Sequence, residues 1–495
     1  MKTSTKTSSL VVLLLAGSQA LAQEAPPPLP ARPEEIVFPP LTFEPPDPAA
    51  FRRDLPGGVV AFLVPDRSLP LVDVRFTFRG GAYLDPKGKE GLSAAVGSMM
   101  RRGGAGDLDA AALDEELDFL AAQVGTGAGE YEVSASLDTL AQNLDRSLEL
   151  LVAILRRPRF QPDRFALWKS EVLEALKQRN DDADSILGRE WARLVYGADH
   201  FKARQVTKAS LDGLTQDDLR AFHARWLHPG NLVIGVSGDF DPDAMTKKLA
   251  RALEGWAAAG AAPAPPAPTH AMAPGVYRVE KDIPQGKVLI GMRSIKRDDP
   301  DYHALMVMSR ILGSGGFTSR IMRRVRSDEG LAYDASAAVI PGLHFPGEFR
   351  ASFQSKSATV ALAAKLVLEE VEKIRTSPVG AQELDVAKGA LIETFPRTFE
   401  SPAATLGVFM SDHLSGRTHA WWKEYRDRVR AVTAEDVQRV AARHLDPAAM
   451  AMLVVGKWSD IAGGDLQGRA KMAELFGGED TELPLRDPLT LEPLR

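Results

Sequence analysis

The chain has 495 residues, enough for more than one domain with a full-sized hydrophobic core. It carries 60 Lys and Arg against 66 Asp and Glu, for a formal net charge of −6, and 44% of its residues are hydrophobic. This composition does not favour bulk nucleic-acid binding or a membrane-embedded body. Because the sequence contains no cysteine, disulfides and a lipid-modified N-terminal Cys are excluded.

Residues 1–22 form a predicted secretory signal peptide. Lys2 and Lys6 precede the apolar run 10–16, and the small residues Ala20 and Ala22 suit cleavage after Ala22. The apolar run is too short to span a bilayer, so we do not expect it to act as a membrane anchor. We therefore expect export from a bacterium to the periplasm, with the extracellular medium as the alternative.

Two proline-rich segments divide the mature chain. Residues 23–56 contain a run of three prolines and two Pro-Pro pairs, which favours an extended N-terminal arm. Residues 257–274 read AAAGAAPAPPAPTHAMAP, the composition of a semi-rigid linker. The sequence thus predicts an N-terminal domain over 57–256, a C-terminal domain over 275–480 and a tail over 481–495.

The two halves end in similar sequences. LTQDDLRAFHARWLHPGNLVIGVSGDF begins at Leu214, and VTAEDVQRVAARHLDPAAMAMLVVGKW begins at Val432. Three pairs align at one constant offset: Thr215 with Thr433, Pro229 with Pro447, and Gly238 with Gly456. In each copy a Thr N-cap precedes a helix with acidic residues in its first turn, and a proline and an apolar strand (232–236 or 450–455) follow. This repeat indicates a duplicated domain.

Strand and helix patterns alternate within the halves. Val72, Val74, Phe76 and Phe78 alternate with polar residues, the period of a half-buried strand. A helical pattern follows over 113–124, with Gly125 expected as its C-cap, and another strand is expected near 131–137. The sequence therefore predicts an α+β fold in which two homologous α/β domains are joined by the Pro/Ala-rich linker.

Several short motifs carry a resemblance to a known family. They are Gly-Gly-Ala at 80–82, Lys-Glu-Gly-Leu at 89–92, the glycine-rich LGSGGFTSR at 312–320, and Arg326 followed by Gly-Leu-Ala-Tyr at 330–333. Over nearly the whole mature chain, this pattern resembles the pitrilysin/insulinase family of zinc peptidases. The resemblance implies a clamshell-like metallopeptidase fold.

The resemblance fails at the metal site. Active members place His-x-x-Glu-His directly after a Gly-Leu pair, so that two His hold zinc and the Glu activates the metal-bound water. Here Ala94 and Ser98 take the His positions, Gly97 takes the Glu position, and Ala175 takes the position of the third ligand, a Glu on a later helix. Glu174 is turned about 100° from the metal face. Since these residues cannot hold zinc, we expect no metal in this chain and no peptide hydrolysis by the chain alone.

The second half keeps the family's other functional pair. Active members use an Arg and a Tyr seven residues apart to grip substrate opposite the zinc, and Arg326 and Tyr333 match this spacing. We expect Arg326 in the last turn of a helix that Gly330 ends, and Tyr333 early in the next strand. Both side chains suit a peptide carbonyl and its developing oxyanion. The alternative is that Arg326 pairs with Asp328 or Glu329 and that Tyr333 is a core residue.

Two further patterns precede this pair. The glycine-rich stretch 313–316 is not a phosphate loop, because no Lys-Ser/Thr follows it, and in the family it would be a mobile loop leading into the Arg-bearing helix. Arg320, Arg323, Arg324 and Arg326 form a basic cluster. We expect a solvated helix face, with acidic groups of a substrate or partner as the alternative contact.

The selective loss of the metal ligands predicts a division of labour. Some bacterial members of the family resemble heterodimers in which one subunit carries His-x-x-Glu-His and the other carries the Arg/Tyr pair. We therefore expect a non-catalytic, substrate-binding subunit of an exported heterodimeric zinc metallopeptidase, with zinc in the partner. The alternatives are a proteolytically inactive peptide-binding or scaffolding homodimer, and an active hydrolase that uses other groups.

Overall fold

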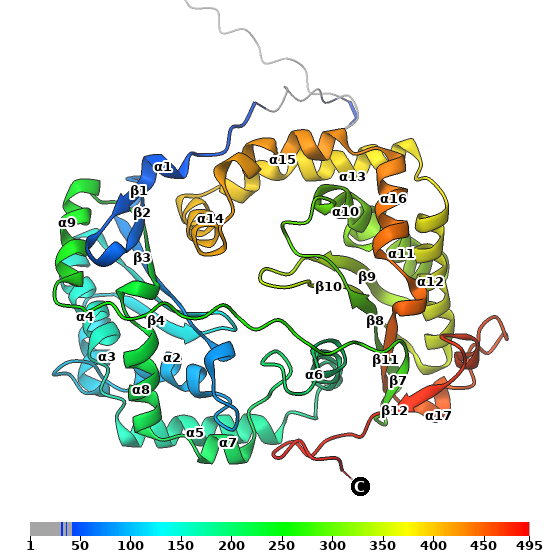
Figure 1. Ribbon diagram of the computed structural model, residues 1–495, viewed down its shortest axis with the longest axis horizontal. Coiled ribbons are helices and arrows are strands. Elements are labelled where there is room, and N and C mark those ends of the chain that lie inside the picture. Colours follow the sequence, from blue (N-terminus) through cyan, green and yellow to red (C-terminus); the bar gives the residue numbers. More distant parts are fainter. Residues whose placement is uncertain (1–30, 33–35, 37–41, 495) are drawn as a thin grey trace, which may run out of the picture. The chain divides into compact units, whose positions relative to one another are not determined.

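The computed structural model describes residues 31–32, 36 and 42–494 (Figure 1). The predicted signal peptide and most of the predicted N-terminal arm lie outside the described residues. The described residues from Glu44 onward belong to one compact unit. Across the part of the chain that the structure describes, no helix combines the length and the hydropathy needed to cross a membrane.

The first half of this unit contains a six-stranded sheet with the strand order β1-β2-β6-β3-β5-β4. β2 and β6 are parallel, and the other neighbours are antiparallel. The predicted alternation in β3 is confirmed, since Val72, Val74, Phe76 and Phe78 are buried in the core that α2, α4 and α8 complete. The strands are β1 Arg52–Asp54, β2 Val60–Pro65, β3 Leu71–Arg79, β4 Gln123–Ala128, β5 Glu132–Leu140 and β6 Leu232–Gly238. The helices are α1 Pro48–Phe51, α2 Leu92–Arg102, α3 Ala110–Phe119, α4 Leu144–Arg156, α5 Pro162–Lys177, α6 Ala183–Tyr196, α7 Lys208–Asp212, α8 Gln216–Trp226 and α9 Pro242–Leu253.

The second half contains a second six-stranded sheet, with the order β12-β7-β11-β8-β10-β9. From its second strand onward it repeats the first sheet, with β7 and β11 parallel and the later neighbours antiparallel. The strands are β7 Gly275–Glu280, β8 Gln285–Arg293, β9 Ala332–Ile340, β10 Glu348–Lys356, β11 Ala451–Gly456 and β12 Asp480–Glu482. The helices are α10 Tyr302–Ser309, α11 Arg320–Met322, α12 Val360–Thr376, α13 Ala381–Glu393, α14 Pro402–Ser415, α15 His419–Ala431, α16 Ala434–His444 and α17 Trp458–Ile461.

The duplication predicted from the sequence is confirmed at the end of each half. α8 and β6 flank Pro229, and α16 and β11 flank Pro447. Thr215 and Thr433 each close a capping box with the acidic residue three positions later, so both helices begin in the same way. The duplicated α+β fold is therefore present in the structure.

One helix from each half packs against the sheet of the other half. α6 packs against β8 and β11, and α14 packs against β2 and β6 (Figure 1). The apolar side of α6, including Trp191, is buried with Leu289 and Leu453, while Phe409 of α14 is buried with Phe62. Because each helix buries its apolar side in the opposite half, separating the halves would expose both cores.

Polar contacts reinforce this exchange. The Glu348 carboxylate, whose residue is only 8% exposed, accepts hydrogen bonds from Trp191 Nε1 at 2.7 Å and from Tyr196 Oη at 3.0 Å. Burial and the nearby carboxylate both raise the pKa of Tyr196, which keeps it a neutral donor. The buried Glu190 on α6 accepts a hydrogen bond from Arg486 Nε at 3.0 Å. The two halves are therefore joined by buried hydrogen bonds as well as by apolar packing.

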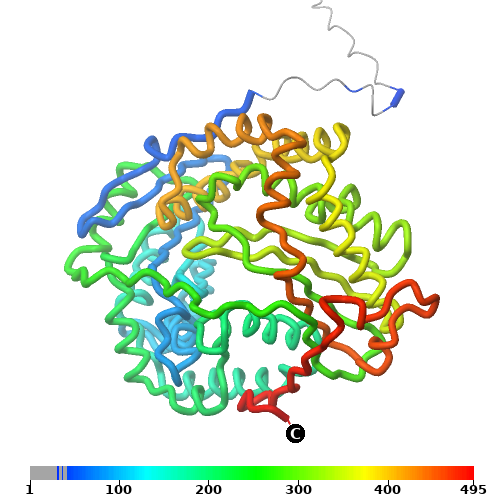
Figure 2. The backbone as a smooth tube through the Cα atoms, turned by 45° about the vertical axis from the view of Figure 1, so that its right-hand side comes forward, coloured from blue at the N-terminus to red at the C-terminus, as the bar shows by residue number. Residues whose placement is uncertain are grey.

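The linker crosses from the first half to the second (Figure 2), and both the linker and the tail contact the first half. Residues between α9 and β7 contain no regular element, as their composition predicts. The linker is nevertheless fastened, because Ala259 N donates to His228 Nδ1 at 3.2 Å and Ala262 N donates to Asn231 Oδ1 at 2.8 Å. In the tail, Leu489 O accepts from the Lys208 N–H at 2.8 Å.

Two local predictions need correction. The helix expected over 113–124 is α3, which ends at Phe119, and Gly125 lies in β4 rather than at a helix C-cap. Ala121 has a φ of 48°, which breaks the helix, and pairing with β5 makes the following residues a strand. The segment expected as an extended arm over 23–56 also contains α1 and β1. β1 pairs with β2, so the first sheet begins before residue 57.

Candidate functional site

Helix α2 carries three of the four positions at which active relatives have catalytic or metal-binding groups. The Asp85 carboxylate holds the start of this helix, accepting from Gly91 N at 3.0 Å and from Ser93 N at 2.8 Å. Burial of Asp85 outweighs these hydrogen bonds and raises its pKa to about 6. Gly91 has a φ of 95°, which explains why a glycine precedes the helix. The frame of the metallopeptidase motif is therefore intact at its N-terminal end.

Helix α5, which carries the fourth position, contacts α2. Gln161, which precedes α5, donates from its N–H to Gly103 O at the end of α2, at 3.1 Å. Arg102 forms a bidentate ion pair with Glu171, with two N···O distances of 2.8 Å. The two helices that carry the former ligand positions are thus joined by a backbone hydrogen bond and an ion pair.

The position of the catalytic Glu is closed as well as changed. A Cβ atom at Gly97 would lie 2.6 Å from the Ala128 N atom and from the Gly127 C atom of β4. Only glycine fits at this spacing, so edge strand β4 rests directly on α2. The strand backbone occupies the space into which a general base at position 97 would extend.

Zinc does not fit at these positions. Ala94 and Ala175 offer no ligand atom, and the Ser98 hydroxyl is a poor zinc ligand. Glu174, the nearest carboxylate in sequence to the third-ligand position, pairs with Lys177 on its own helix at 2.6 Å. The residues at the former ligand positions therefore do not form a zinc site.

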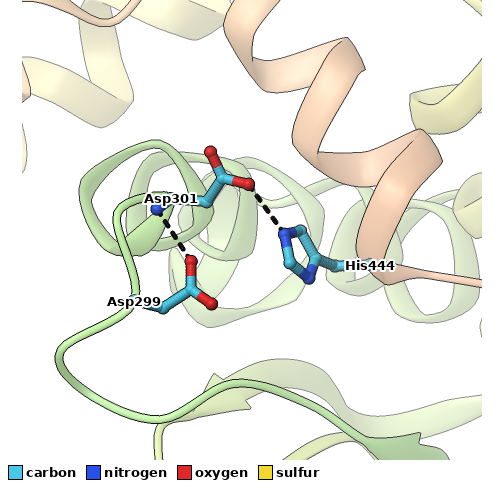
Figure 3. A group of neighbouring side chains, drawn as sticks. All are labelled: Asp299, Asp301 and His444. Carbon is cyan, nitrogen blue, oxygen red and sulfur yellow. Dashed lines mark hydrogen bonds and ion pairs between the residues drawn. The ribbon is translucent and has the colours of Figure 1, made fainter.

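One other group in the described part of the chain has the composition of a metal site: Asp299, Asp301 and His444 (Figure 3). Asp301 accepts hydrogen bonds from His444 Nε2 and Arg439 Nη1, both at 2.8 Å, and from Arg443 Nη1 at 3.2 Å. Burial would raise the pKa of Asp301, but the hydrogen bonds from His444 and Arg439 lower it. Two guanidinium groups already neutralise this carboxylate, so the group fastens α16 to the start of α10.

Arg326 and Tyr333 meet at the surface of the second half. Arg326 lies in the π-helical turn Arg323–Asp328, Gly330 follows with a φ of 65°, and Tyr333 is the second residue of edge strand β9. The guanidinium carbon of Arg326 lies 4.9 Å from the centre of the Tyr333 ring. Tyr333 is 85% exposed, so the alternative of a core tyrosine is wrong.

The neighbouring charges leave Arg326 without an acidic partner among the residues that the structure describes. Glu329 accepts instead from Arg469 Nη1 at 2.7 Å and lies 3.6 Å from Arg324. The expectation that Arg320 belongs to a solvated face is wrong. Its residue is 8% exposed, and its side chain forms a bidentate ion pair with Glu383 on α13, at 2.8 and 2.7 Å.

Phe317 is a site residue that sequence reasoning missed. The Arg326 guanidinium carbon lies 4.7 Å from the centre of its ring, so the guanidinium is flanked by two aromatic side chains. Phe317 is 69% exposed, which is unusual for a side chain of this size. An aromatic residue directly after the glycine-rich stretch was the only signal in the sequence. Beside Tyr333, β8, β9, β10 and α6 line a groove of about 700 Å³.

Together, the fold and the site define a duplicated, metallopeptidase-like protein in which the metal ligands are replaced and the Arg/Tyr pair is retained. Residues 213–391 match the family model described as the peptidase M16 inactive domain. The chain is 28% identical over 350 residues to the non-peptidase homolog YmxG of Helicobacter pylori, covering 69% of this chain and 78% of that protein. It is also 28% identical over 248 residues to the uncharacterized zinc protease ML0855 of Mycobacterium leprae, covering 47% and 55% of the two chains.

A solved structure shares the fold of this chain. The peptidase M16 inactive domain from Pseudomonas fluorescens superposes with a TM-score of 0.74 at 24% identity, covering 82% of this chain and 97% of that one. The match of residues 213–391 to the peptidase M16 inactive domain, together with these relatives, bears out the resemblance to the pitrilysin/insulinase family.

Proposed function

We propose that this chain is the non-catalytic, substrate-binding subunit of an exported heterodimeric zinc metallopeptidase. The observation that carries the proposal is the uneven loss of function between the halves. Ala94, Ser98 and Ala175 stand where ligands belong, whereas Arg326 and Tyr333 are assembled and exposed. The match to the M16 inactive domain supports the same division.

Arg326 and Tyr333 bring hydrogen-bond donors to this task. The guanidinium offers five N–H donors in a fixed plane, and the phenol offers one O–H donor. Both suit a substrate carbonyl oxygen, and the interaction with Arg326 strengthens as negative charge develops on that oxygen. A zinc-bearing partner would supply the metal-bound water. This chain would bind and orient the peptide.

Reconstitution tests the proposal. The chain is mixed with a homologue from the same bacterium that carries His-x-x-Glu-His, and cleavage of a quenched fluorescent peptide is followed. Arg326→Ala should lower kcat/KM by about 100-fold, the usual effect of removing one donor to an oxyanion, and Tyr333→Phe should also lower it. Arg323→Ala is the matched control, because Arg323 is exposed in the same turn. Equal cleavage without this chain, or equal effects of Arg326→Ala and Arg323→Ala, would sink the proposal.

A peptide-binding or scaffolding homodimer is the second candidate. The description of the Helicobacter pylori relative as a non-peptidase homolog favours it. Light scattering of the purified chain, alone and with the homologue, separates the two candidates. A stable homodimer that excludes the homologue supports the scaffold.

Export is a separate part of the proposal. The basic and apolar pattern of residues 1–22 supports a cleaved signal peptide. N-terminal sequencing of the protein from the periplasmic fraction should begin at Gln23. A cytoplasmic protein that retains residues 1–22 would contradict export.

A further inference from the structure

The Arg326 side chain is held in an unusual way for this part of the chain. Arg320 and Arg324, in the same segment, are fixed by Glu383 and Glu329. Arg326 instead lies against Phe317 and Tyr333, with its guanidinium carbon 4.7 and 4.9 Å from the two ring centres. Both rings are largely exposed, so core packing does not explain their positions.

The glycine-rich stretch explains how the Phe317 ring reaches this position. A Cβ atom at Gly313 would clash with the backbone of Ala337, so the π-helical turn Arg310–Ser314 rests directly on β9, the strand that carries Tyr333. Gly316 has a φ of 62°, which turns the chain into the short 3-10 helix Gly316–Thr318. The Ser319 hydroxyl closes this turn by donating to Gly316 O at 2.7 Å. The same backbone features thus set the positions of both rings.

Holding an arginine by aromatic rings leaves its hydrogen-bonding capacity free. A carboxylate partner takes up N–H donors at the edge of the guanidinium plane, as Glu383 does with Arg320. An aromatic ring attracts the charge through its π face and needs no N–H donor. Arg326 is therefore kept in place with its donors available for a ligand.

We infer that Phe317 is a positioning residue, which holds the Arg326 guanidinium in its substrate-facing orientation without occupying the N–H donors. This inference rests on the proposed function. The Tyr333 ring also contacts the Arg326 guanidinium, so replacing Tyr333 would remove a hydrogen-bond donor and an aromatic contact together. Phe317 has no polar atom and acts only through Arg326.

The isolated full-length chain provides the first test. With ¹⁵N-labelled arginine, the Nε–Hε resonance of Arg326 is assigned by its absence in Arg326→Lys. The ring current of Phe317 should displace this resonance, and Phe317→Leu should return it toward the position of an exposed arginine. Phe317→Trp should keep it displaced. A resonance that does not move in Phe317→Leu would overturn the inference, whether or not a partner exists.

Reconstituted peptide cleavage provides the second test. Phe317→Leu should lower kcat/KM about 2- to 5-fold, the factor that corresponds to an exposed cation–π contact. Phe317→Tyr should retain the wild-type rate, and Ser327→Ala, at an exposed position of the same turn, serves as the control. In an Arg326→Ala background, Phe317→Leu should have no further effect.

The outcomes separate the inference from the proposed function. If Arg326→Ala slows cleavage and Phe317→Leu does not, the positioning role is wrong and the proposed function stands. If neither substitution slows cleavage, the proposed function fails and the inference fails with it. If Phe317→Leu slows cleavage equally in the Arg326→Ala background, Phe317 acts independently of Arg326, which also overturns the inference.

Discussion

Replacing Gly97 with alanine tests whether edge strand β4 closes the former catalytic position. The added Cβ atom would lie 2.6 Å from two backbone atoms of β4, whereas ordinary van der Waals contact begins at 3.4 Å. The strand or the helix must therefore shift by about 0.8 Å. β4 pairs with only one neighbour, β5, so it is the element that can move.

Two opposing effects determine how much Gly97→Ala changes the free energy of unfolding. Overpacking of this kind costs about 1–3 kcal/mol. Replacing glycine with alanine inside a helix stabilises the folded state by about 0.5–1 kcal/mol. We expect Gly97→Ala to lower the free energy of unfolding by about 0.5–2 kcal/mol as the difference between these effects.

Gly188→Ala in α6 is the matched control, because nothing lies within 4 Å of the added Cβ atom and the position is exposed. It should stabilise the protein by up to about 1 kcal/mol. Guanidinium titrations of both variants should give midpoints that shift in opposite directions at equal slope. Amide hydrogen exchange should also become faster in β4 of Gly97→Ala.

Equal stability of the two alanine variants would refute the reasoning. It would mean that β4 is not seated on α2 and that a side chain at position 97 has room. The absence of a catalytic Glu would then be a change of one residue type, without closure of the site.

Three other measurements test the structure. Because burial raises the pKa of Asp85 from 3.8 to about 6, its stabilising contribution is complete below pH 3.8 and is lost as the pH rises through 6. Between pH 4.5 and 7.5 the wild type should lose about 2 kcal/mol relative to Asp85→Asn in denaturant titrations, and a constant difference would contradict the shift. Glu348→Ala leaves Trp191 and Tyr196 without their acceptor and should lower the free energy of unfolding by about 2–4 kcal/mol. Tyr196→Phe removes only one of the two hydrogen bonds and should lower it by about 1 kcal/mol. Equal losses in the two variants would show that Glu348 does not join the halves. Restoring the three metal ligands should give about one bound zinc ion per chain by elemental analysis, without peptide hydrolysis because no general base is present, and absence of zinc would show that α2 and α5 do not present these positions together. The substitutions are Ala94→His, Ser98→His and Ala175→Glu.

Local sequence was sufficient for the elements that local interactions determine. The capping boxes at Thr215 and Thr433 and the apolar alternation in β3 depend on residues a few positions apart, and both were predictable. The expected helix over 113–124 failed where β4 pairs with β5. This pairing is a local hairpin, but β4 also rests on α2, which is more distant in sequence, and these contacts together outweigh the helical pattern.

In the candidate site, too, some features followed from residue type alone and others depended on the fold. The loss of ligand chemistry at Ala94, Ser98 and Ala175 could be seen from residue types alone, because alanine has no donor atom in any conformation. The contact of Phe317 with Arg326 could not be predicted, because it depends on how the glycine-rich turn rests on β9. The ion pair of Arg320 with Glu383 likewise joins two distant segments.

The sequence by itself determined that the chain is a duplicated α+β protein that resembles a zinc-peptidase family, that the former ligand positions hold Ala94, Ser98 and Ala175, and that an arginine and a tyrosine stand seven residues apart. Only the tertiary structure decided that β4 covers Gly97, that α6 and α14 are exchanged between the halves, and that Arg326 is held by two rings. The physical reason is that residue type sets what chemistry a position can perform, whereas packing partners are chosen among segments far apart in the chain.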